Sequence, residues 1–363
     1  MKVLHLTKVS GVGGAEQHLL SLLPALRERG VDAEFLSLDA GGDSGRFHRA
    51  LDERGIPWSR VACGLDLSPR LAADVTRRVR DLKPDLVHTH MVHADAYGSL
   101  AAHLLRVPFV STRHNDDRYL LGPFRYVDRG LMHGVRRIVA ISEAVRLFHI
   151  EAGLPAAKLE TIHYGLDETP AVPSEVTPEQ LGVPAGAPLV LAIGRLIAQK
   201  DHATLLEAFG RVREAHPEAR LAILGWGPLE AQTQEHVRRL GLADSVLLPG
   251  RVEPREWLER AEVFAHTSRW EGFGIVLLEA MLSSLPVVAT RVSAVPEIVV
   301  DGETGLLADP CDAGTIAGHL IRLLGDESQR AALGANGLRR AREHFSVGRM
   351  TDLTLDVYER AAG

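Results

Sequence analysis

Two carboxylates and a glycine turn stand together in the stretch Ser268–Ala280, which reads SRWEGFGIVLLEA. Glu271 precedes Gly272-Phe273-Gly274, and Glu279 follows Glu271 at a distance of roughly two turns of helix. Glycines let a ligand approach the backbone, and the free N–H groups at a helix start favour phosphate. The pattern predicts a phosphate-containing ligand beside two carboxylates. The alternative is a helix that carries two glutamates on a solvated face.

Basic residues near a second strand end could neutralise such a phosphate. Gly194-Arg195-Leu196 follows the apolar run Leu189–Ile193, and Lys200-Asp201 opens the next helical pattern. An arginine and a lysine at this spacing near a helix start can both meet one diphosphate, although an ordinary surface pair is the alternative. Two further glycine turns follow predicted strands, namely Gly225-Trp226-Gly227-Pro228 and Gly250-Arg251-Val252.

Histidines lie at predicted strand ends in the N-terminal half. His88 and His90 close the run Leu86–His90, and His114-Asn115 follows the next run, Phe109–Thr112. Histidine clusters can bind transition metals, so a metal site is one interpretation. The alternatives are a core histidine at position 88 and ligand contacts at positions 90 and 114, because ligands bind at the carboxyl ends of strands in doubly wound folds.

Another glycine turn, Gly11–Glu16, comes directly after the first predicted strand. Its spacing fits a dinucleotide fingerprint at Gly11 and Gly13 but has Glu16 where the third glycine belongs, while Asp32 lies near the distance of a ribose-binding acid. The other interpretation is a loop that closes on a diphosphate or on an acceptor.

Short apolar runs alternate with helical patterns on both sides of a proline-rich segment. Such alternation predicts βαβ units and parallel sheets with helices on both faces. We expect an N-terminal Rossmann-like domain at 1–168, a linker at 169–188, a second Rossmann-like domain at 189–345, and a C-terminal helix at 346–363 that packs back on the first domain.

Composition narrows the function classes. The net charge of −6 argues against a nucleic-acid partner. Up to residue 170 there are 22 basic and 21 acidic residues, against 19 and 26 afterwards, so an anionic partner fits the N-terminal half better. Two cysteines give no disulfide framework, and no apolar run is long enough to span a membrane. A cytoplasmic location is the expectation.

Taken in order, these motifs resemble those of glycosyltransferase family 4. Glu271 to Glu279 resembles its E-x7-E motif, and Gly194–Asp201 resembles its G-R-L-x-x-x-K-D motif. Pro296–Val299 followed by Asp301–Leu307 resembles its P-E-I-V and D-G-x-T-G-x-L segment. Gly13–Glu16 is similar to its G-G-A-E loop, and His114 to its T-x-H position. Trp226 stands where the family usually has Asp, which leaves the nucleotide preference open.

The resemblance implies a GT-B fold, in which two Rossmann-like domains face each other across a cleft, and a retaining transfer of a hexose from a nucleotide sugar, with UDP favoured and GDP possible, to a hydroxyl acceptor. It implies no metal or other cofactor, since no D-x-D motif is present. Catalytic roles fall to Glu271, His114, Arg195 and Lys200. Donor binding falls to Gly13, Gly14, Gly194, Gly225, Gly250, Arg251, Val252, Gly272, Phe273, Gly274, Ile275, Val276 and Glu279. The acceptor-side candidates are Glu16, His90 and Asn115.

Two other functions share the fold: a GT-B enzyme of different chemistry, such as a sugar-nucleotide 2-epimerase or a phosphorylase, and a partner subunit without activity. The E-x7-E and G-R-L-x-x-x-K-D motifs point away from the epimerase, and the chain is short for most phosphorylases. The presence of Glu271, Glu279, Arg195 and Lys200 argues against an inactive subunit.

A membrane surface is a further expected partner. The segment Phe124–Arg137, FRYVDRGLMHGVRR, mixes basic and apolar residues in the way of helices that rest on anionic lipid. The alternative is an amphipathic helix packed on its own sheet.

Overall fold

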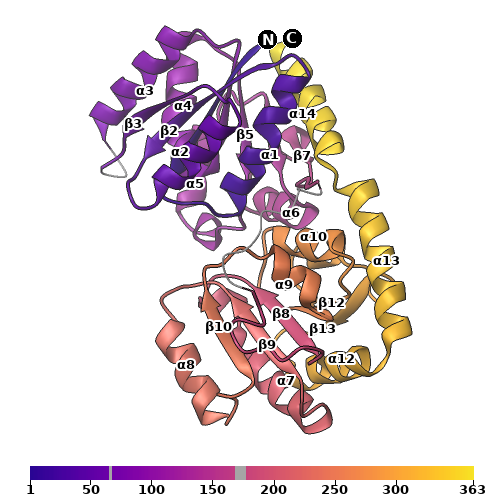
Figure 1. Ribbon diagram of the computed structural model, residues 1–363. Helices are drawn as coiled ribbons and strands as arrows, with labels where there is room; N and C mark the ends of the chain where they lie inside the picture. The colour runs from indigo at the N-terminus through magenta and orange to yellow at the C-terminus, as the bar shows by residue number, and fades with distance from the viewer. Residues whose placement is uncertain (65–67, 168–176) are drawn as a thin grey trace. The chain divides into compact units, whose positions relative to one another are not determined.

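The computed structural model describes residues 1–363 except 65–67 and 168–176 (Figure 1). The chain divides into two compact units. The first holds Met1–Leu166 and Phe345–Gly363, and the second holds Asp167–His344. The first part of the predicted linker, 169–176, lies outside the described residues. Its remainder belongs to the second unit, where the Arg260 guanidinium donates to the carbonyl oxygens of Pro184 and Ala187 at 3.2 and 2.7 Å.

The first unit is built on a parallel sheet with the strand order β3-β2-β1-β4-β5-β6-β7. The strands are β1 (Lys2–Val9), β2 (Asp32–Asp39), β3 (Trp58–Ala62), β4 (Leu86–His90), β5 (Phe109–Arg113), β6 (Arg137–Ala140) and β7 (Leu159–Thr161). The chain builds outward from β1 to β3 and then restarts on the other side with β4. The loops after β1 and β4 therefore diverge, which is where doubly wound folds bind ligands.

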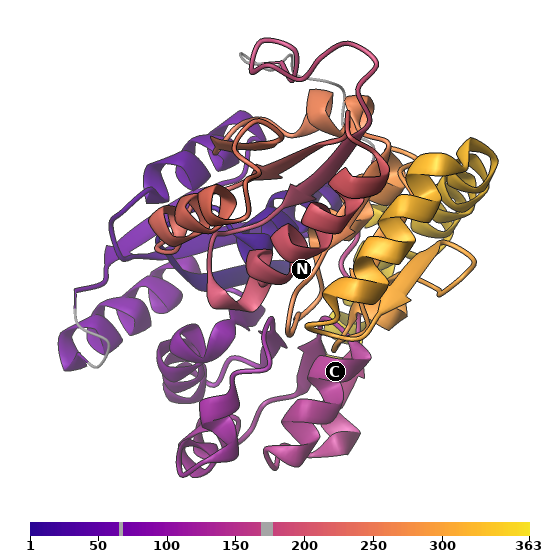
Figure 2. The same ribbon diagram turned by 90° about the horizontal axis from the view of Figure 1, so that it is seen from below.

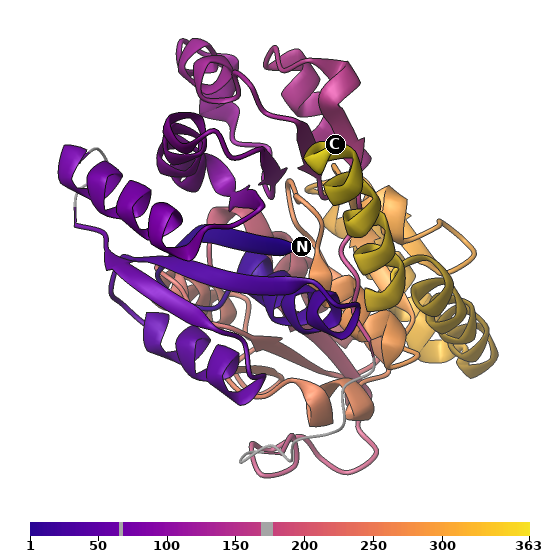
Figure 3. The same ribbon diagram turned by 90° about the horizontal axis from the view of Figure 1, so that it is seen from above.

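Helices cover both sides of this sheet, as Figure 3 shows from above. They are α1 (Gly14–Glu28), α2 (Ser44–Glu53), α3 (Pro69–Leu82), α4 (Met91–Leu105), α5 (Phe124–Leu131), α6 (Glu143–Glu151) and α14 (Val347–Ala362), with short 3-10 turns at Arg118–Leu121 and Ala156–Lys158. The last helix, α14, packs against α1, so that the N- and C-termini lie together in Figure 1. Val357, Tyr358 and Ala361 bury its inner face in the core of this unit.

The second unit has a parallel sheet with the order β10-β9-β8-β11-β12-β13. Its strands are β8 (Leu189–Ile193), β9 (Arg220–Leu224), β10 (Val246–Gly250), β11 (Val263–His266), β12 (Val287–Thr290) and β13 (Gly305–Ala308). The order reverses between β8 and β11, whose carboxyl ends are therefore the expected ligand site of this unit.

The helices of the second unit are α7 (His202–Ala215), α8 (Glu230–Arg239), α9 (Arg255–Arg260), α10 (Ile275–Leu282), α11 (Val295–Ile298), α12 (Ala313–Gly325) and α13 (Glu327–His344), with a 3-10 turn at Ala198–Lys200. Figure 2 shows α7 and α12 side by side against the sheet. Their buried faces contribute Leu205, Phe209, Ile316 and Leu320 to the core. Burying one side chain of this size contributes about 1.5–3 kcal/mol.

The sequence predicted one helix over Phe124–Arg137, and this prediction was wrong in its length. The helix α5 ends at Leu131, and Arg137 begins β6. Phe124, Tyr126 and Val127 are 61, 61 and 57% exposed, so these three apolar residues of the helix do not pack on its own sheet. Its one buried side chain is Asp128, which pairs with Arg113 at 2.8 Å.

Candidate active site

The loops that follow β8 and β11 meet at the point where the strand order of the second unit reverses. The first loop carries Arg195 and Lys200, and the second carries Glu271. Because β8 and β11 are hydrogen-bonded neighbours, their carboxyl ends bring these predicted residues together although about seventy residues separate them in the chain.

Polar contacts tie the two loops to each other. Arg269 pairs with the buried Asp201 at 3.0 Å, and its backbone N–H donates to the carbonyl oxygen of Gln199 at 2.8 Å. The Gln199 amide donates to the carbonyl oxygen of Trp270 at 2.9 Å, and the Thr267 hydroxyl donates to that of Lys200 at 3.1 Å. The backbone on both sides of the Lys200 and Glu271 side chains is therefore fixed.

Glu271 is the centre of this site. Its Oε2 accepts from the Lys200 ammonium, from His266 Nε2 at 3.1 Å and from Ser268 Oγ at 3.2 Å. The side chains of Lys200 and Glu271 are 14 and 11% exposed, so this is a largely buried ion pair. The Ser293 hydroxyl lies 3.3 Å from the Glu271 backbone N–H and accepts from it.

The partners of Glu271 determine its charge. Burial opposes its ionisation, but the Lys200 ammonium and the hydrogen bond from His266 outweigh burial, and the pKa of Glu271 lies well below its ordinary value. Burial also lowers the pKa of His266, so this ring is neutral near pH 7 and can donate one proton from Nε2. The site therefore presents a fixed carboxylate beside a fixed ammonium.

The turn after Glu271 leads into α10 as the sequence predicts. Gly274 caps this helix with φ 93°, in the left-handed region, so glycine is required there. Phe273 is buried and anchors the turn, and Ile275 and Val276 form the first helical positions. Leu277 N–H donates to the cap carbonyl oxygen of Gly274 at 2.9 Å. The two N–H groups before it, those of Ile275 and Val276, have no carbonyl oxygen one turn back within the helix, which suits a phosphate or another anion.

Glu279 lies on α10 and is half-buried. Burial and the nearby Glu253 carboxylate raise its pKa to about 7. Glu271 and Glu279 therefore differ in charge near neutral pH: Glu271 is ionised, whereas Glu279 is present in both its protonated and its ionised form. A ligand with hydroxyl groups to donate would favour the ionised form of Glu279.

The three glycine turns of the second unit follow neighbouring strands. Gly194 N–H donates to Leu224 O at 2.9 Å, and Gly225 N–H donates to Gly250 O at 2.8 Å. A Cβ on Gly225 would lie 2.0 Å from the Gly194 carbonyl oxygen, so only glycine fits. Arg195 is exposed, and its guanidinium makes no ion pair within the described residues. Arg251 and the half-buried Val252 follow Gly250 at the same sheet edge.

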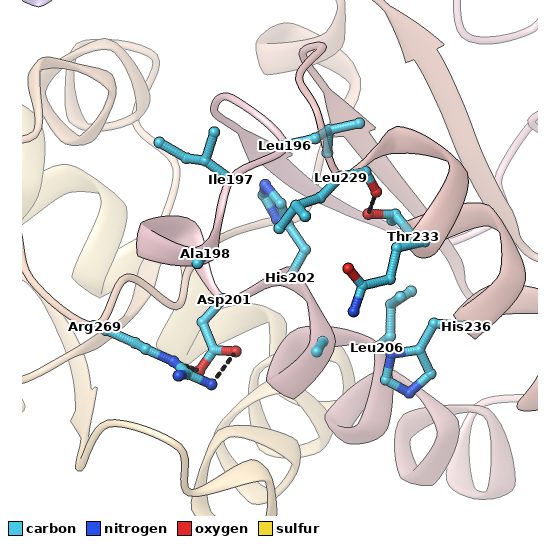
Figure 4. A pocket seen from close by; sticks show the side chains of 12 residues that line it. Leu196, Ile197, Ala198, Asp201, His202, Leu206, Leu229, Thr233, His236 and Arg269 are labelled. Atoms are coloured by element: carbon cyan, nitrogen blue, oxygen red, sulfur yellow. Dashed lines mark hydrogen bonds and ion pairs between the residues drawn. The ribbon is translucent and has the colours of Figure 1, made fainter.

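A cavity of about 160 Å³ lies beside the loop that carries Arg195 and Lys200 (Figure 4). Leu196, Asp201, His202, Thr233 and Arg269 contribute to its lining, whereas Lys200 and Glu271 do not. Small-molecule sites are typically about 300–1,000 Å³, so this cavity is too small for a nucleotide sugar. Because neither Lys200 nor Glu271 lines it, this cavity is separate from the place where those two side chains meet.

In the first unit, His90 and His114 lie at the carboxyl ends of neighbouring strands and contact each other. His90 Nδ1 is 3.0 Å from His114 Nε2, and His114 Nδ1 is hydrogen-bonded to the Tyr164 hydroxyl. Both rings are buried. Both nitrogens of His114 therefore already have hydrogen-bond partners, so a contact from this ring to a ligand must replace one of these hydrogen bonds.

The other predicted residues of this unit are placed as follows. Gly13 caps α1, and Gly14 is its first residue. Glu16 Oε2 accepts from the Gly13 backbone N–H at 2.9 Å, so one oxygen of this acceptor-side candidate stabilises the helix start. Asn115 is exposed, and its carbonyl oxygen accepts from His149.

Sequence reasoning missed several residues around these sites. His266 and Ser268 hold Glu271, and both belong to the polar run that follows β11. His5 and His18 join the histidine cluster. A histidine between Leu4 and Leu6 in a buried strand was the available signal for His5. His5, His88 and His90 have nitrogens close enough together to hold a metal ion, and each of these rings is also hydrogen-bonded to other side chains.

Two family models match the chain. The model described as Glycosyltransferase Family 4 matches residues 12–169, and the model described as Glycosyl transferases group 1 matches residues 173–340. Together they cover both units, and their boundary lies near the division between them.

The relatives and solved structures agree with this assignment. D-inositol 3-phosphate glycosyltransferase of Xylanimonas cellulosilytica is 34% identical over 76% of this chain and 72% of its own length. Alpha-maltose-1-phosphate synthase of Mycolicibacterium smegmatis is 29% identical over 96% of both chains. The crystal structure of Anabaena Alr3699/HepE with UDP and glucose aligns with a TM-score of 0.85 at 25% identity, over 99% of both chains. The predicted GT-B fold is thereby confirmed.

Proposed function

Because the chain belongs to glycosyltransferase family 4, we propose that it is a retaining glycosyltransferase that moves a hexose from a nucleotide sugar, with UDP as the favoured nucleotide, to a hydroxyl acceptor without a metal ion. The contact between the Lys200 ammonium and the Glu271 carboxylate carries the proposal. It holds one cation and one anion side by side at the carboxyl ends of β8 and β11, where a doubly wound sheet binds its ligand.

Transfer breaks a sugar–phosphate bond, so negative charge grows on the departing diphosphate. Lys200 has three N–H donors and can keep one on Glu271 while it gives another to a phosphate oxygen. The exposed Arg195 guanidinium supplies a second cation, and the free N–H groups at the start of α10 add a positive dipole end. Together with the Gly13–Gly14 loop, these groups would supply the positive potential that other transferases take from Mg²⁺.

The two glutamates have different roles in this proposal. Glu271 accepts hydrogen bonds from the sugar hydroxyls and fixes the ring against the bond that breaks. Glu279 accepts from the two ribose hydroxyls, because its two oxygens match a vicinal diol. Gly225, Gly250, Arg251 and Val252 line the nucleoside side of the site. His114 contacts the transferred sugar and gives up one of its present hydrogen bonds to do so.

Retention follows from transfer on a single face of the sugar, with the leaving phosphate taking the proton of the acceptor hydroxyl. No side chain is assigned as general base. The relatives are named as glycosyltransferases or synthases, so an epimerase is not favoured. The charged residues of the two motifs are all present, so an inactive partner subunit is not favoured either; they are Arg195, Lys200, Glu271 and Glu279.

UDP is favoured because the HepE structure holds UDP and glucose. Two relatives are named after phosphorylated compounds, inositol 3-phosphate and maltose 1-phosphate, so the acceptor panel should include polyol and sugar phosphates. Peripheral contact with an anionic membrane is supported by Arg118, Arg125 and Arg129, which are exposed beside the apolar residues of α5. No helix in the described part of the chain could cross a membrane.

The test is nucleotide release from UDP-, GDP- and ADP-sugars, each with and without the acceptor panel. We expect acceptor-dependent release from one nucleotide class. Release from none of them by folded protein, as judged by a cooperative melting transition, would contradict the proposed function. The Lys200→Ala variant serves as the blank for contaminating activity.

A further inference from the structure

Seven buried side chains of the first unit form one unbroken hydrogen-bonded chain. From Tyr164 the chain passes to His114, from His114 Nε2 to His90 Nδ1 at 3.0 Å, and from His90 Nε2 to His5 Nδ1 at 3.1 Å. It continues from His5 Nε2 to the Tyr358 hydroxyl at 3.3 Å, from this hydroxyl to His88 Nδ1 at 2.6 Å, and from His88 Nε2 to the Thr112 hydroxyl at 2.7 Å. The members come from β1, β4, β5, α14 and the segment after β7.

The four histidines in this chain are neutral. Burial lowers the pKa of His5 to about 3 and lowers the pKa values of His88, His90 and His114 far below their ordinary values, with like charges on neighbouring rings adding to the effect. A neutral imidazole has one N–H donor and one bare nitrogen that accepts. Tyr358 stays protonated because burial raises its pKa well above the usual range.

The links between these rings all run in the same sense. Along the chain from Tyr164, every histidine is entered at Nδ1 and left at Nε2. A hydrogen bond between two rings needs exactly one proton, so a proton on Nε2 of His114 requires a bare Nδ1 on His90 and hence a proton on its Nε2. The same argument passes through His5 and, by way of the Tyr358 hydroxyl, to His88.

We propose that His114, His90, His5 and His88 share one tautomer, either all protonated on Nε2 or all on Nδ1, and that Tyr358 on α14 is a positioning residue that links His88 to the other three. A mixed state would place two protons or none in one of the contacts and leave a buried polar group unsatisfied, which costs about 1–3 kcal/mol, or roughly tenfold to a hundredfold in population. The C-terminal helix therefore helps to decide which nitrogen of His114 can donate.

The two ends of the chain allow a direct test. Thr112→Val removes the hydroxyl that either accepts a proton from His88 Nε2 or donates one to it. Tyr164→Phe does the same at His114 Nδ1. A buried N–H without a partner costs more than a bare nitrogen without one, so Thr112→Val favours the Nδ1-protonated state and Tyr164→Phe favours the Nε2-protonated state. Long-range proton–nitrogen correlation spectra of protein labelled with ¹⁵N at histidine report the tautomer of each ring. We expect opposite tautomers in the two variants at all four histidines.

The role of Tyr358 is tested by adding Tyr358→Phe to Thr112→Val. Without the Tyr358 hydroxyl, Thr112→Val should change the tautomer of His88 only. The tautomer of His114 should be the same in the double variant as in the Tyr358→Phe single variant. Tyr97→Phe is the matched control, because Tyr97 is a buried tyrosine of the same unit whose hydroxyl contacts the Ser68 backbone N–H outside this chain. Two results would overturn the inference. One is that the four histidines change tautomer independently of one another. The other is that Thr112→Val still changes the tautomer of His114 when Tyr358→Phe is also present.

The consequence for turnover rests on the proposed contact between His114 and the sugar. Tyr358→Phe should lower kcat by about tenfold and leave the donor KM within about twofold, whereas Tyr97→Phe should change neither. An unchanged kcat together with coupled tautomers would contradict the proposed role of His114 but not the coupling. A protein without transferase activity would contradict the proposed function while the spectra still decide the coupling.

Discussion

Lys200 and Glu271 illustrate what single residues can and cannot reveal in the sequence. Their types and motifs predict a cation and a carboxylate at a phosphate site, and the strand order confirms that they come from neighbouring strand ends. Their direct contact could not be predicted, because it depends on the loop path fixed by Asp201 and Arg269. The partners His266 and Ser268 were missed for the same reason.

Lys200→Ala should remove charge that is needed most when the diphosphate leaves. Loss of one such group typically lowers kcat about 10²–10³-fold. Lys158→Ala is the matched control, since Lys158 is also a half-buried lysine, but its ammonium donates to the backbone carbonyl oxygen of Val135 at 2.8 Å rather than to a carboxylate. Steady-state kinetics measure kcat for both variants. If kcat of Lys200→Ala lies within about threefold of the value for the unmodified enzyme, Lys200 has only a structural role, as the ion-pair partner of Glu271.

Glu279 should make donor binding depend on pH. Its pKa is raised to about 7 in the empty protein, and the ionised form is the one that accepts from ribose. Affinity is therefore full above about pH 7 and falls as the carboxyl group is protonated, by about tenfold between pH 8 and pH 6. Calorimetry with an intact nucleotide sugar measures this, because both of its phosphates are esterified and do not titrate in this range.

Two variants serve as controls for this dependence. Glu279→Gln should bind more weakly and with little pH dependence. Glu253→Gln removes the neighbouring carboxylate that helps to raise the pKa, and should shift the profile toward lower pH. Equal affinity of the unmodified enzyme at both pH values would refute the role of Glu279.

Among the secondary-structure elements, the sequence predicted the central strands and most of the helices well, but it predicted most of the edge strands and several of the other helices poorly. The buried central strands carry continuous apolar runs, which identify them directly. The edge strands β3 and β7 were not predicted, because their polar and half-buried residues give a weak pattern. The short buried edge strand β13 and the helices α2, α6, α11 and α13 were not predicted either. The Phe124–Arg137 helix was wrong in its length because Gly134 adopts φ 78° shortly before β6 begins.

Gly225→Ala tests whether the glycine turns hold the donor site together. The new Cβ would meet the Gly194 carbonyl oxygen, which must then move along with the loop that carries Arg195. We expect donor affinity to fall by at least about tenfold. Gly241→Ala is the control, since Gly241 has φ 69° but open space around its Cβ, and should cost about 1–2 kcal/mol of stability without any change in affinity.

The exposed residues of α5 provide a test of membrane contact. Co-sedimentation with vesicles of rising anionic lipid content should bring down the protein at low salt and less of it at high salt, where screening is stronger. Replacing Phe124, Tyr126 and Val127 by serine should abolish binding. Leu104→Ser, at another exposed apolar residue of the same unit, should not. Protein that stays in the supernatant at low salt would favour a small acceptor free in solution.

Across the whole molecule, the two units share the doubly wound arrangement but differ in the residues at the carboxyl ends of their strands. Where the strand order reverses, the second unit has the Lys200–Glu271 ion pair, whereas the first unit has neutral histidines. This difference fits a proposed division of labour in which the second unit holds the anionic donor. The fold class followed from the sequence, whereas the histidine chain did not, because it joins residues from both ends of the protein.

Proton NMR of the transfer reaction in excess EDTA tests retention and metal independence in one experiment. With the donor that nucleotide release identifies and its acceptor, we expect the product to have the same anomeric configuration as the α-linked donor and to form at a rate unaffected by the chelator. An inverted product, or a reaction that stops in EDTA and resumes with Mg²⁺ or Mn²⁺, would contradict this expectation.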